Sequence, residues 1–166
     1  MKMKSLLLAL ITALFLASCA SKKPGNNQDN AQDGDSSSAY GSPLELNGDS
    51  DNRAAGGLRT IFFSVDNSTL NDESRAILKE NAAFLEKYSN ITIQIEGHAD
   101  ERGGRQYNLA LGEKRANAVR EYLKALGIKA DRISTISYGN EKPMVEGHDE
   151  SSWSKNRRGN FVVTSK

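Results

Sequence analysis

The chain has 166 residues, with 22 basic and 21 acidic side chains, a formal net charge of +1 at pH 7 and a single cysteine. This length suits one domain with a tail. The near-zero charge disfavours a nucleic-acid binder, which normally carries a basic excess. One cysteine excludes a disulfide scaffold and a zinc ribbon.

The first nineteen residues have the pattern of a secretory signal. Lys2 and Lys4 precede an apolar run over residues 5–16, which is too short for a membrane span of roughly 20 residues. The run ends in Leu-Ala-Ser-Cys at residues 16–19, which resembles a bacterial lipobox, where the thiol is diacylated and the chain is then cut before it. A plain signal peptide with a chance cysteine is the alternative.

Lipidation of Cys19 would anchor the protein to a bilayer without a membrane-spanning segment. Each buried acyl methylene contributes about 0.8 kcal/mol, so the three chains usual in bacterial lipoproteins anchor a protein effectively permanently. Ala20 and Ser21 follow the cysteine, with no Asp at the second position. By resemblance to Gram-negative lipoproteins, this favours sorting to the outer membrane, with the domain in the periplasm.

The following segment, residues 20–57, is crowded with Asn, Asp, Ser and Gly. It has too little apolar surface to offset the entropy of ordering, so we predict a flexible tether. Leu44 and Leu46 are the only hint of structure, a short strand-like contact. The predicted organisation is a signal peptide over 1–18, a lipidated cysteine and tether over 19–57, and one domain over 58–166.

Hydrophobic periodicity begins at Leu58. Residues 61–65 predict a strand apolar enough to be central and buried. Asn71 is the predicted N-cap of a helix over 72–88, with two acidic residues in its first turn. Residues 91–96 alternate between apolar and polar side chains, which predicts a strand with one buried face.

The second half of the domain begins with a loop over 97–104. A helix is predicted over 105–126, because one apolar stripe runs along it, and Gly127 ends it. Strands over 133–138 and 161–164 follow, with a short helix over 149–156. The order β-α-β-α-β-β predicts an α/β two-layer sandwich, with a mixed sheet and both helices on one face.

An acid and a base on neighbouring elements form the candidate site. Asp100 lies just beyond the carboxyl end of its strand, where open α/β sheets commonly place ligands. Asn108, Leu111 and Arg115 share one side of the second helix. We expect Arg115 to be partly covered, with its guanidinium facing outward near the loop.

Two interpretations of this pair remain open. Asp100 and Arg115 could form a salt bridge that only pins the loop, since such pairs are common. Alternatively, the two groups are held apart and bind a zwitterion, an ammonium beside a carboxylate, through charge-assisted hydrogen bonds of about 1.5–3 kcal/mol each.

Other chemistries are weaker. His98, His148 and Asp100 match no standard zinc spacing, so we predict no metal and no cofactor, and His98 is interpreted as a loop residue with ordinary hydrogen bonds. A hydrolase is disfavoured because no Gly-x-Ser-x-Gly elbow is present. Arg157 and Arg158 could bind phosphate, but the near-zero net charge favours exposed surface positions without a ligand.

Several motifs together resemble the OmpA-like peptidoglycan-binding domain family of Gram-negative bacteria, over roughly residues 60–164. The family's helix signature, Asn-x2-Leu-[Ser/Gly]-x2-Arg-Ala-x2-Val-x3-Leu, is met from Asn108 to Leu123. The remaining motifs are Gly-His-Ala-Asp-Glu-Arg-Gly at 97–103, Ser-Tyr-Gly at 137–139 and Gly-His-Asp-Glu at 147–150.

The resemblance implies a ligand, the free end of meso-diaminopimelate in the peptidoglycan stem peptide. In this family the loop Asp and the helix Arg hold it, which are Asp100 and Arg115 here. Arg102 and the end of the first strand near Phe63 also contribute, and Asn108 and Leu111 shape the pocket wall. One departure is Ser64, which stands where the family often has an Asp at the pocket edge.

The resemblance further implies a non-catalytic anchor that links the outer membrane to peptidoglycan within the Tol system, with the propeller protein TolB as a partner. An anchor of another envelope machine without a Tol partner would share every motif. A periplasmic peptidoglycan hydrolase is the remote alternative.

Overall fold

The structure is a computed structural model that describes residues 43–166. The predicted signal peptide, Cys19 and the first part of the predicted tether lie outside these residues. Within 43–166, no helix is both long enough and apolar enough to cross a membrane.

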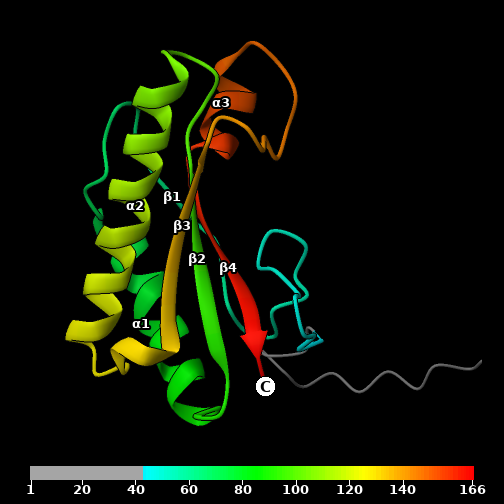
Figure 1. Cartoon of the computed structure of the whole chain (residues 1–166), viewed down its shortest axis with the longest axis vertical. Coiled ribbons are helices and arrows are strands. Elements are labelled where there is room, and N and C mark those ends of the chain that lie inside the picture. Colours follow the sequence, from blue (N-terminus) through cyan, green and yellow to red (C-terminus); the bar gives the residue numbers. More distant parts are fainter. Residues whose placement is uncertain (1–42) are drawn as a thin grey trace, which may run out of the picture. The chain divides into compact units, whose positions relative to one another are not determined.

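A four-stranded mixed sheet forms the centre of the domain, in the order β1-β4-β2-β3 (Figure 1). β2 and β3 are parallel, whereas β4 is antiparallel to both β1 and β2. The predicted α/β sandwich with a mixed sheet is therefore confirmed. The strands are β1 (Ile61–Phe62), β2 (Thr92–His98), β3 (Ile133–Gly139) and β4 (Arg158–Ser165).

The first strand differs from its prediction. The sequence predicts a central, buried strand over 61–65, but β1 has two residues and lies at the edge of the sheet. Phe62 is consequently 44% exposed. The reason is that β4 takes the central position, and it pairs with β1 only through Gly159 and Arg158.

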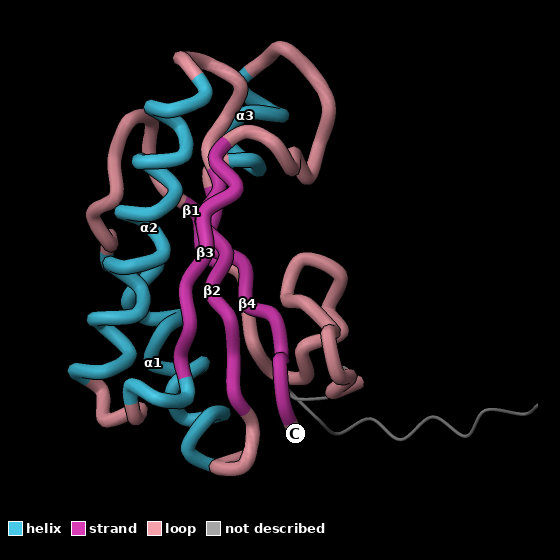
Figure 2. Tube along the Cα trace, viewed as in Figure 1, coloured by secondary structure: helices cyan, strands magenta, loops and turns pink. Residues whose placement is uncertain are grey.

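Two long helices cover one face of the sheet, as predicted (Figures 1 and 2). α1 (Asp72–Lys87) begins where expected, because Asn71 accepts a hydrogen bond from the Ser74 amide at 2.7 Å. α2 (Arg105–Ala125) ends just before Gly127, whose φ of 102° suits glycine. A short helix η1 (Ala130–Arg132) precedes β3, and α3 (Glu150–Asn156) precedes β4.

The hydrophobic core lies between the sheet and these two helices. A very close contact between α2 and β2 fixes the helix on the sheet, since a Cβ atom at Gly97 would lie 1.9 Å from the Gly112 carbonyl oxygen. The fully buried apolar side chains include Ile61, Leu78, Leu85, Ile93, Ile95, Val119, Leu123, Phe161 and Val163.

Residues 43–57, which we call the strap, pack along the free edge of β4. The amides of Asn47 and Ser50 donate to carbonyl oxygens of β4 at 2.8 and 2.9 Å, and Val163 donates back to Gly48 at 3.0 Å. Leu44 pairs with Ala55, which is fully buried. The packed part of the chain therefore begins before the predicted domain start at Leu58, because backbone pairing replaces the missing apolar side chains.

Candidate functional site

The loop that carries Asp100 is fixed at both of its ends. At its start, the amide of Ala99 donates to the carbonyl of Gly139 in β3 at 2.8 Å. Within it, Gly103 adopts a φ of 92°, which reverses the chain toward α2. From α2, the side-chain amide of Asn108 donates to the carbonyl oxygens of Asp100 and Arg102 at 3.3 and 3.1 Å. Asn108 therefore holds the loop against the helix.

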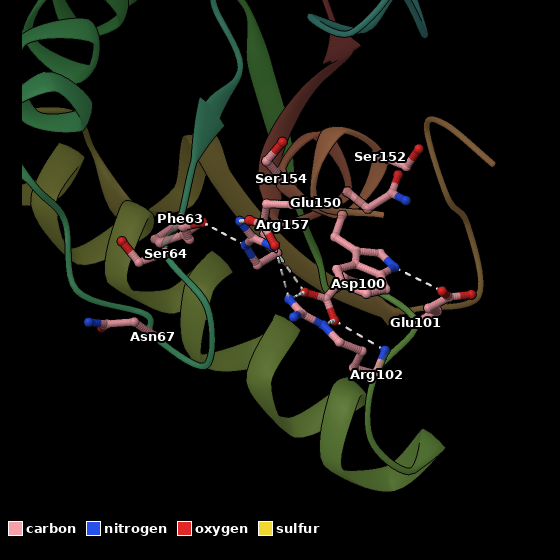
Figure 3. Close-up of polar contacts among 12 residues, drawn as sticks. Phe63, Ser64, Asn67, Asp100, Glu101, Arg102, Glu150, Ser152, Ser154 and Arg157 are labelled. Atoms are coloured by element: carbon pink, nitrogen blue, oxygen red, sulfur yellow. Dashed lines mark hydrogen bonds and ion pairs between the residues drawn. The ribbon is translucent and has the colours of Figure 1, made fainter. Parts of the chain in front are cut away.

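Asp100 is buried and paired with two arginines (Figure 3). Its Oδ2 lies 2.6 Å from Arg102 and 3.2 Å from Arg157, while its Oδ1 accepts from the Arg102 amide and Nε. Burial alone would raise the pKa of this carboxyl, but the hydrogen bonds from both arginines outweigh it and lower the pKa. Asp100 is therefore a carboxylate at neutral pH.

Arg115 is fully buried, which the sequence did not predict. Its guanidinium donates to the carbonyl oxygens of Ser64, Asn67 and His98 at 3.0, 2.9 and 2.8 Å, and it lies 5.2 Å from the Phe63 ring centre. Burial lowers its pKa from 12.5 to about 10, so it stays charged at pH 7. No carboxylate of the described residues forms an ion pair with it.

A salt bridge between Asp100 and Arg115, one of the two interpretations of this pair, is thus absent from the described part of the chain. Instead, both residues line one pocket of about 310 Å³, together with Arg102, Asn108 and Leu111. Phe63, the remaining predicted residue, does not line this pocket but contacts two residues that do: the Arg115 guanidinium lies 5.2 Å from its ring centre, and its carbonyl accepts from Arg157 at 3.1 Å. Five of the six residues predicted within the domain therefore line one pocket, and the sixth, Phe63, is adjacent to it.

His98 differs from its interpretation as a hydrogen-bonded loop residue. It ends β2, is 1% exposed, and neither ring nitrogen has a hydrogen-bond partner among the described residues. Desolvation lowers its pKa, so the imidazole is neutral at pH 7. In residues 43–166, no group of histidine, cysteine and acidic side chains is arranged to hold a metal.

A family model described as the OmpA family matches residues 62–157. The chain belongs to the OmpA family. It is 42% identical to the peptidoglycan-associated lipoprotein of Rhizobium meliloti, over 95% of this chain and 86% of that one. It is 40% identical to the protein of the same name from Pseudomonas aeruginosa, over 90% and 91%.

A solved structure agrees with this placement in the OmpA family. The crystal structure of the peptidoglycan-associated lipoprotein from Burkholderia pseudomallei matches with a TM-score of 0.61 and 43% identity. The match covers 63% of this chain and 89% of that one. The OmpA-like domain of FopA1 from Francisella tularensis is 25% identical, with a TM-score of 0.55 over 64% and 73% of the two chains.

Three polar side chains that line this OmpA-family pocket were missed by the sequence analysis. Arg157 was interpreted as surface decoration, but it is buried and joins Asp100 to Glu150 (Figure 3). Asp66 and Tyr107 also line the pocket, and the Tyr107 hydroxyl donates to Asp66. No local pattern marks Arg157. Asp66 lies two residues after Ser64, the position at which this sequence departs from the family pattern, so that motif could have pointed to it.

A second set of contacts, from Trp153 of α3 and from His148 just before it, stabilises the loop that carries Asp100. Glu101 accepts from the indole of Trp153 and from His148, both at 2.8 Å, and the Arg102 guanidinium lies 4.1 Å from the centre of a Trp153 ring. The hydrogen bond to Glu101 raises the pKa of His148. The loop of the OmpA-family site is therefore held from both α2 and α3.

Proposed function

We propose that this protein is an outer-membrane lipoprotein whose domain binds peptidoglycan non-covalently, through the free end of meso-diaminopimelate in the stem peptide. One observation carries the proposal: Arg115 is buried and charged, lines a pocket and has no ion-pair partner in residues 43–166. An unpaired buried charge is costly unless something compensates it, which favours an anionic ligand. The role is attachment, not catalysis.

The carboxylate of the ligand would bind Arg115. A guanidinium has five N–H donors, and three of these already donate to backbone carbonyl oxygens. Two donors remain, which is the number that a bidentate carboxylate contact requires. Because Ser64, Asn67 and His98 hold the guanidinium through their backbone, this half of the site is already in place before the ligand arrives.

The ammonium of the ligand would bind the acidic side of the pocket. Asp66 contributes an exposed carboxylate at the rim, of which one oxygen accepts from Tyr107. The four acceptor positions of Asp100 are filled by Arg102 and Arg157. Access to Asp100 therefore requires displacement of Arg102, whose side chain is 39% exposed, rather than of the buried Arg157.

The names of the relatives support both proposed attachments, to peptidoglycan and to the membrane. Proteins called peptidoglycan-associated lipoproteins match along most of this chain, which supports peptidoglycan as ligand and lipidation of Cys19 as membrane anchor. Tol components, TolB above all, are proposed as partners from the family resemblance alone. Recovery of TolB after mild crosslinking would support that partner, whereas recovery of another envelope machine in its place would favour the alternative anchor.

The ligand is tested by sedimentation with purified sacculi in the presence of free diaminopimelate. The full chain should pellet with sacculi, diaminopimelate should release it, and Asp100→Asn should not pellet. Asp131→Asn, which changes an exposed acid in η1, is the matched control and should pellet as wild type does. The pocket assignment would be refuted if diaminopimelate did not reduce the amount of pelleted protein and Asp100→Asn pelleted as wild type does.

The anchor is tested separately. Cys19→Ser should yield a product that no longer partitions into detergent. Unchanged detergent partitioning of Cys19→Ser would contradict lipidation at this residue, without bearing on the pocket. Release of soluble fragments from sacculi over time would instead indicate an enzyme.

A further inference from the structure

A second hollow lies on the face of the sheet that carries no helix. Side chains alternate along strands, so Glu96 and His98 of β2 project away from α1 and α2, beside Asn160 of β4. The strap forms one wall and the loop after β3 the other, around a volume of about 530 Å³. We call this hollow the polar groove; its polar lining includes Asn47, Asn52, Glu96, His98 and Lys142.

The floor of the polar groove contains an unsatisfied imidazole. His98 is 1% exposed and both ring nitrogens lack a hydrogen bond to the described residues, while a Glu96 oxygen lies 3.6 Å from Nε2. Buried side-chain polar atoms nearly always have a partner. A neutral imidazole offers one donor and one acceptor, so a ligand that meets it must be able to do both.

The charges of the groove are largely matched within the protein. Asp51 pairs with Arg158 at 2.7 Å, and Glu96 accepts from the Asn160 amide at 3.0 Å. The acids and histidines of residues 43–166 do not form a metal site. These pairings argue against a small cation as ligand, and equally against a strongly charged anion.

The remaining lining mixes donors, acceptors and apolar surface. The Asn47 side-chain amide offers both a donor and an acceptor. The Asn52 side-chain N–H already donates to the Asp49 carboxylate at 2.9 and 3.1 Å, so Asn52 offers its carbonyl oxygen. Lys142 adds an ammonium, which lies 3.6 Å from the centre of the Tyr138 ring. Pro143 and Met144 supply apolar contact, with Met144 43% exposed. A chain of hydroxyl and acetamido groups matches this lining, since each group donates and accepts and the acetyl methyl and ring C–H atoms are apolar.

We propose that the polar groove binds the glycan backbone of peptidoglycan, through the hydroxyl and acetamido groups of its N-acetylated sugars. This inference rests on the proposed function, because the same polymer then carries the stem peptide bound beside Arg115. His98 belongs to both sites: its carbonyl oxygen holds Arg115, and its ring faces the groove. The domain would bind the two chemically different parts of one polymer at two separate sites that share His98.

The test is a titration of the ¹⁵N-labelled full chain, in detergent, with the tetramer of N-acetylglucosamine, which lacks any stem peptide. Amide signals of residues 47–52, Glu96 and Asn160 should shift, and those of residues 100–104 should not. Maltotetraose, which has hydroxyl groups but no acetamido groups, should give markedly smaller shifts. Equal shifts with both sugars would overturn the assignment to an N-acetylated glycan.

Variants locate the binding within the groove. Asn47→Gly is tolerated by the backbone, because the φ of Asn47 is 61°, and it removes one amide. Lys142→Met removes the ammonium but keeps the side-chain length. Each should weaken the apparent affinity for the tetramer about 3-fold to 10-fold, as expected for one hydrogen bond. Lys129→Met, at an exposed position before η1, should change nothing.

The outcomes separate this inference from the proposed function. Asp100→Asn should abolish the diaminopimelate-sensitive sedimentation while leaving the tetramer shifts intact. Absence of shifts at millimolar tetramer, or shifts confined to residues 100–104, would overturn the groove assignment. Neither result would alter the competition by diaminopimelate, which is decided by sedimentation alone.

Discussion

Replacement of Arg115 by methionine tests the buried cation directly. It would leave the carbonyl oxygens of Ser64, Asn67 and His98 without their donors, at about 1–3 kcal/mol each and about 3–9 kcal/mol in total. Burial lowers the pKa of Arg115 from 12.5 to about 10, so removing the charge returns about 3 kcal/mol of desolvation. The expected loss in unfolding free energy is about 0–6 kcal/mol, centred near 3 kcal/mol.

Ligand binding should suffer more than folding in this variant. Domains are typically stable by about 5–15 kcal/mol, so Arg115→Met should remain folded at 25 °C. The carboxylate of the ligand would lose two charge-assisted hydrogen bonds, worth about 1.5–3 kcal/mol each. Affinity for the diaminopimelate end should therefore fall at least about 100-fold.

Two measurements on the full chain decide this. Urea unfolding followed by circular dichroism gives the free energy, and sedimentation with sacculi gives binding. Lys114→Met removes an exposed positive charge from the same helix and should leave both unchanged. If Arg115→Met sedimented as wild type does, the carboxylate would bind elsewhere. A loss in unfolding free energy well above about 6 kcal/mol would refute the magnitude worked out above.

Three further results are expected. Burial lowers the pKa of His98, so the unfolded chain binds a proton more readily than the folded state does, and the free energy of unfolding falls as the pH drops below 6.5. The urea midpoint of His98→Phe should therefore change less between pH 7.5 and 5 than that of wild type. An equal decline in both proteins would contradict this. The pKa of Asp100 is also lowered, so its contribution to folding stability is present above pH 3.8 and is lost as the pH falls through the lower pKa of the folded state. In Asp100→Asn, the free energy of unfolding should lack this acid-sensitive part. Gly112→Ala should destabilise by about 1–3 kcal/mol despite the better helix propensity of alanine, because its Cβ would lie 2.3 Å from the Ser137 Oγ; a raised melting temperature would show that α2 can shift.

The sequence predicts those features of the fold that depend on neighbours along the chain. The Asn71 cap and the apolar stripe place both helices to within a residue or two, because capping and periodicity are local. The rule that ligands lie beyond strand ends, together with the helical spacing of Arg115, predicts that the two residues lie near one another. Asp100 and Arg115 consequently line one pocket, as the geometry of these two elements required.

The surroundings of the two charges could not be predicted in the same way. Arg115 is held by backbone carbonyl oxygens of the irregular segment after β1, and any residue type supplies a carbonyl. Arg157 becomes buried only because β4 enters the sheet between β1 and β2, which no periodicity over a few residues reveals. The strap is missed for a related reason, because its contacts with β4 are made mainly by backbone groups.

The two halves of the pocket differ in how much must move, and this difference predicts a ligand preference. Arg115 is fixed by backbone, whereas Asp100 is reached only after the exposed Arg102 is displaced. The ligand carboxylate therefore gains its full contact at once, while the ammonium must first compete with an existing ion pair. We compare two stem tripeptides that differ in the third residue. Lysine lacks the side-chain carboxylate of diaminopimelate, whereas 2-aminopimelate lacks its side-chain ammonium. The lysine tripeptide should compete for the domain far less than the 2-aminopimelate tripeptide. Competition against sacculi measures this order, and the reverse order would mean that the acidic side of the pocket dominates recognition.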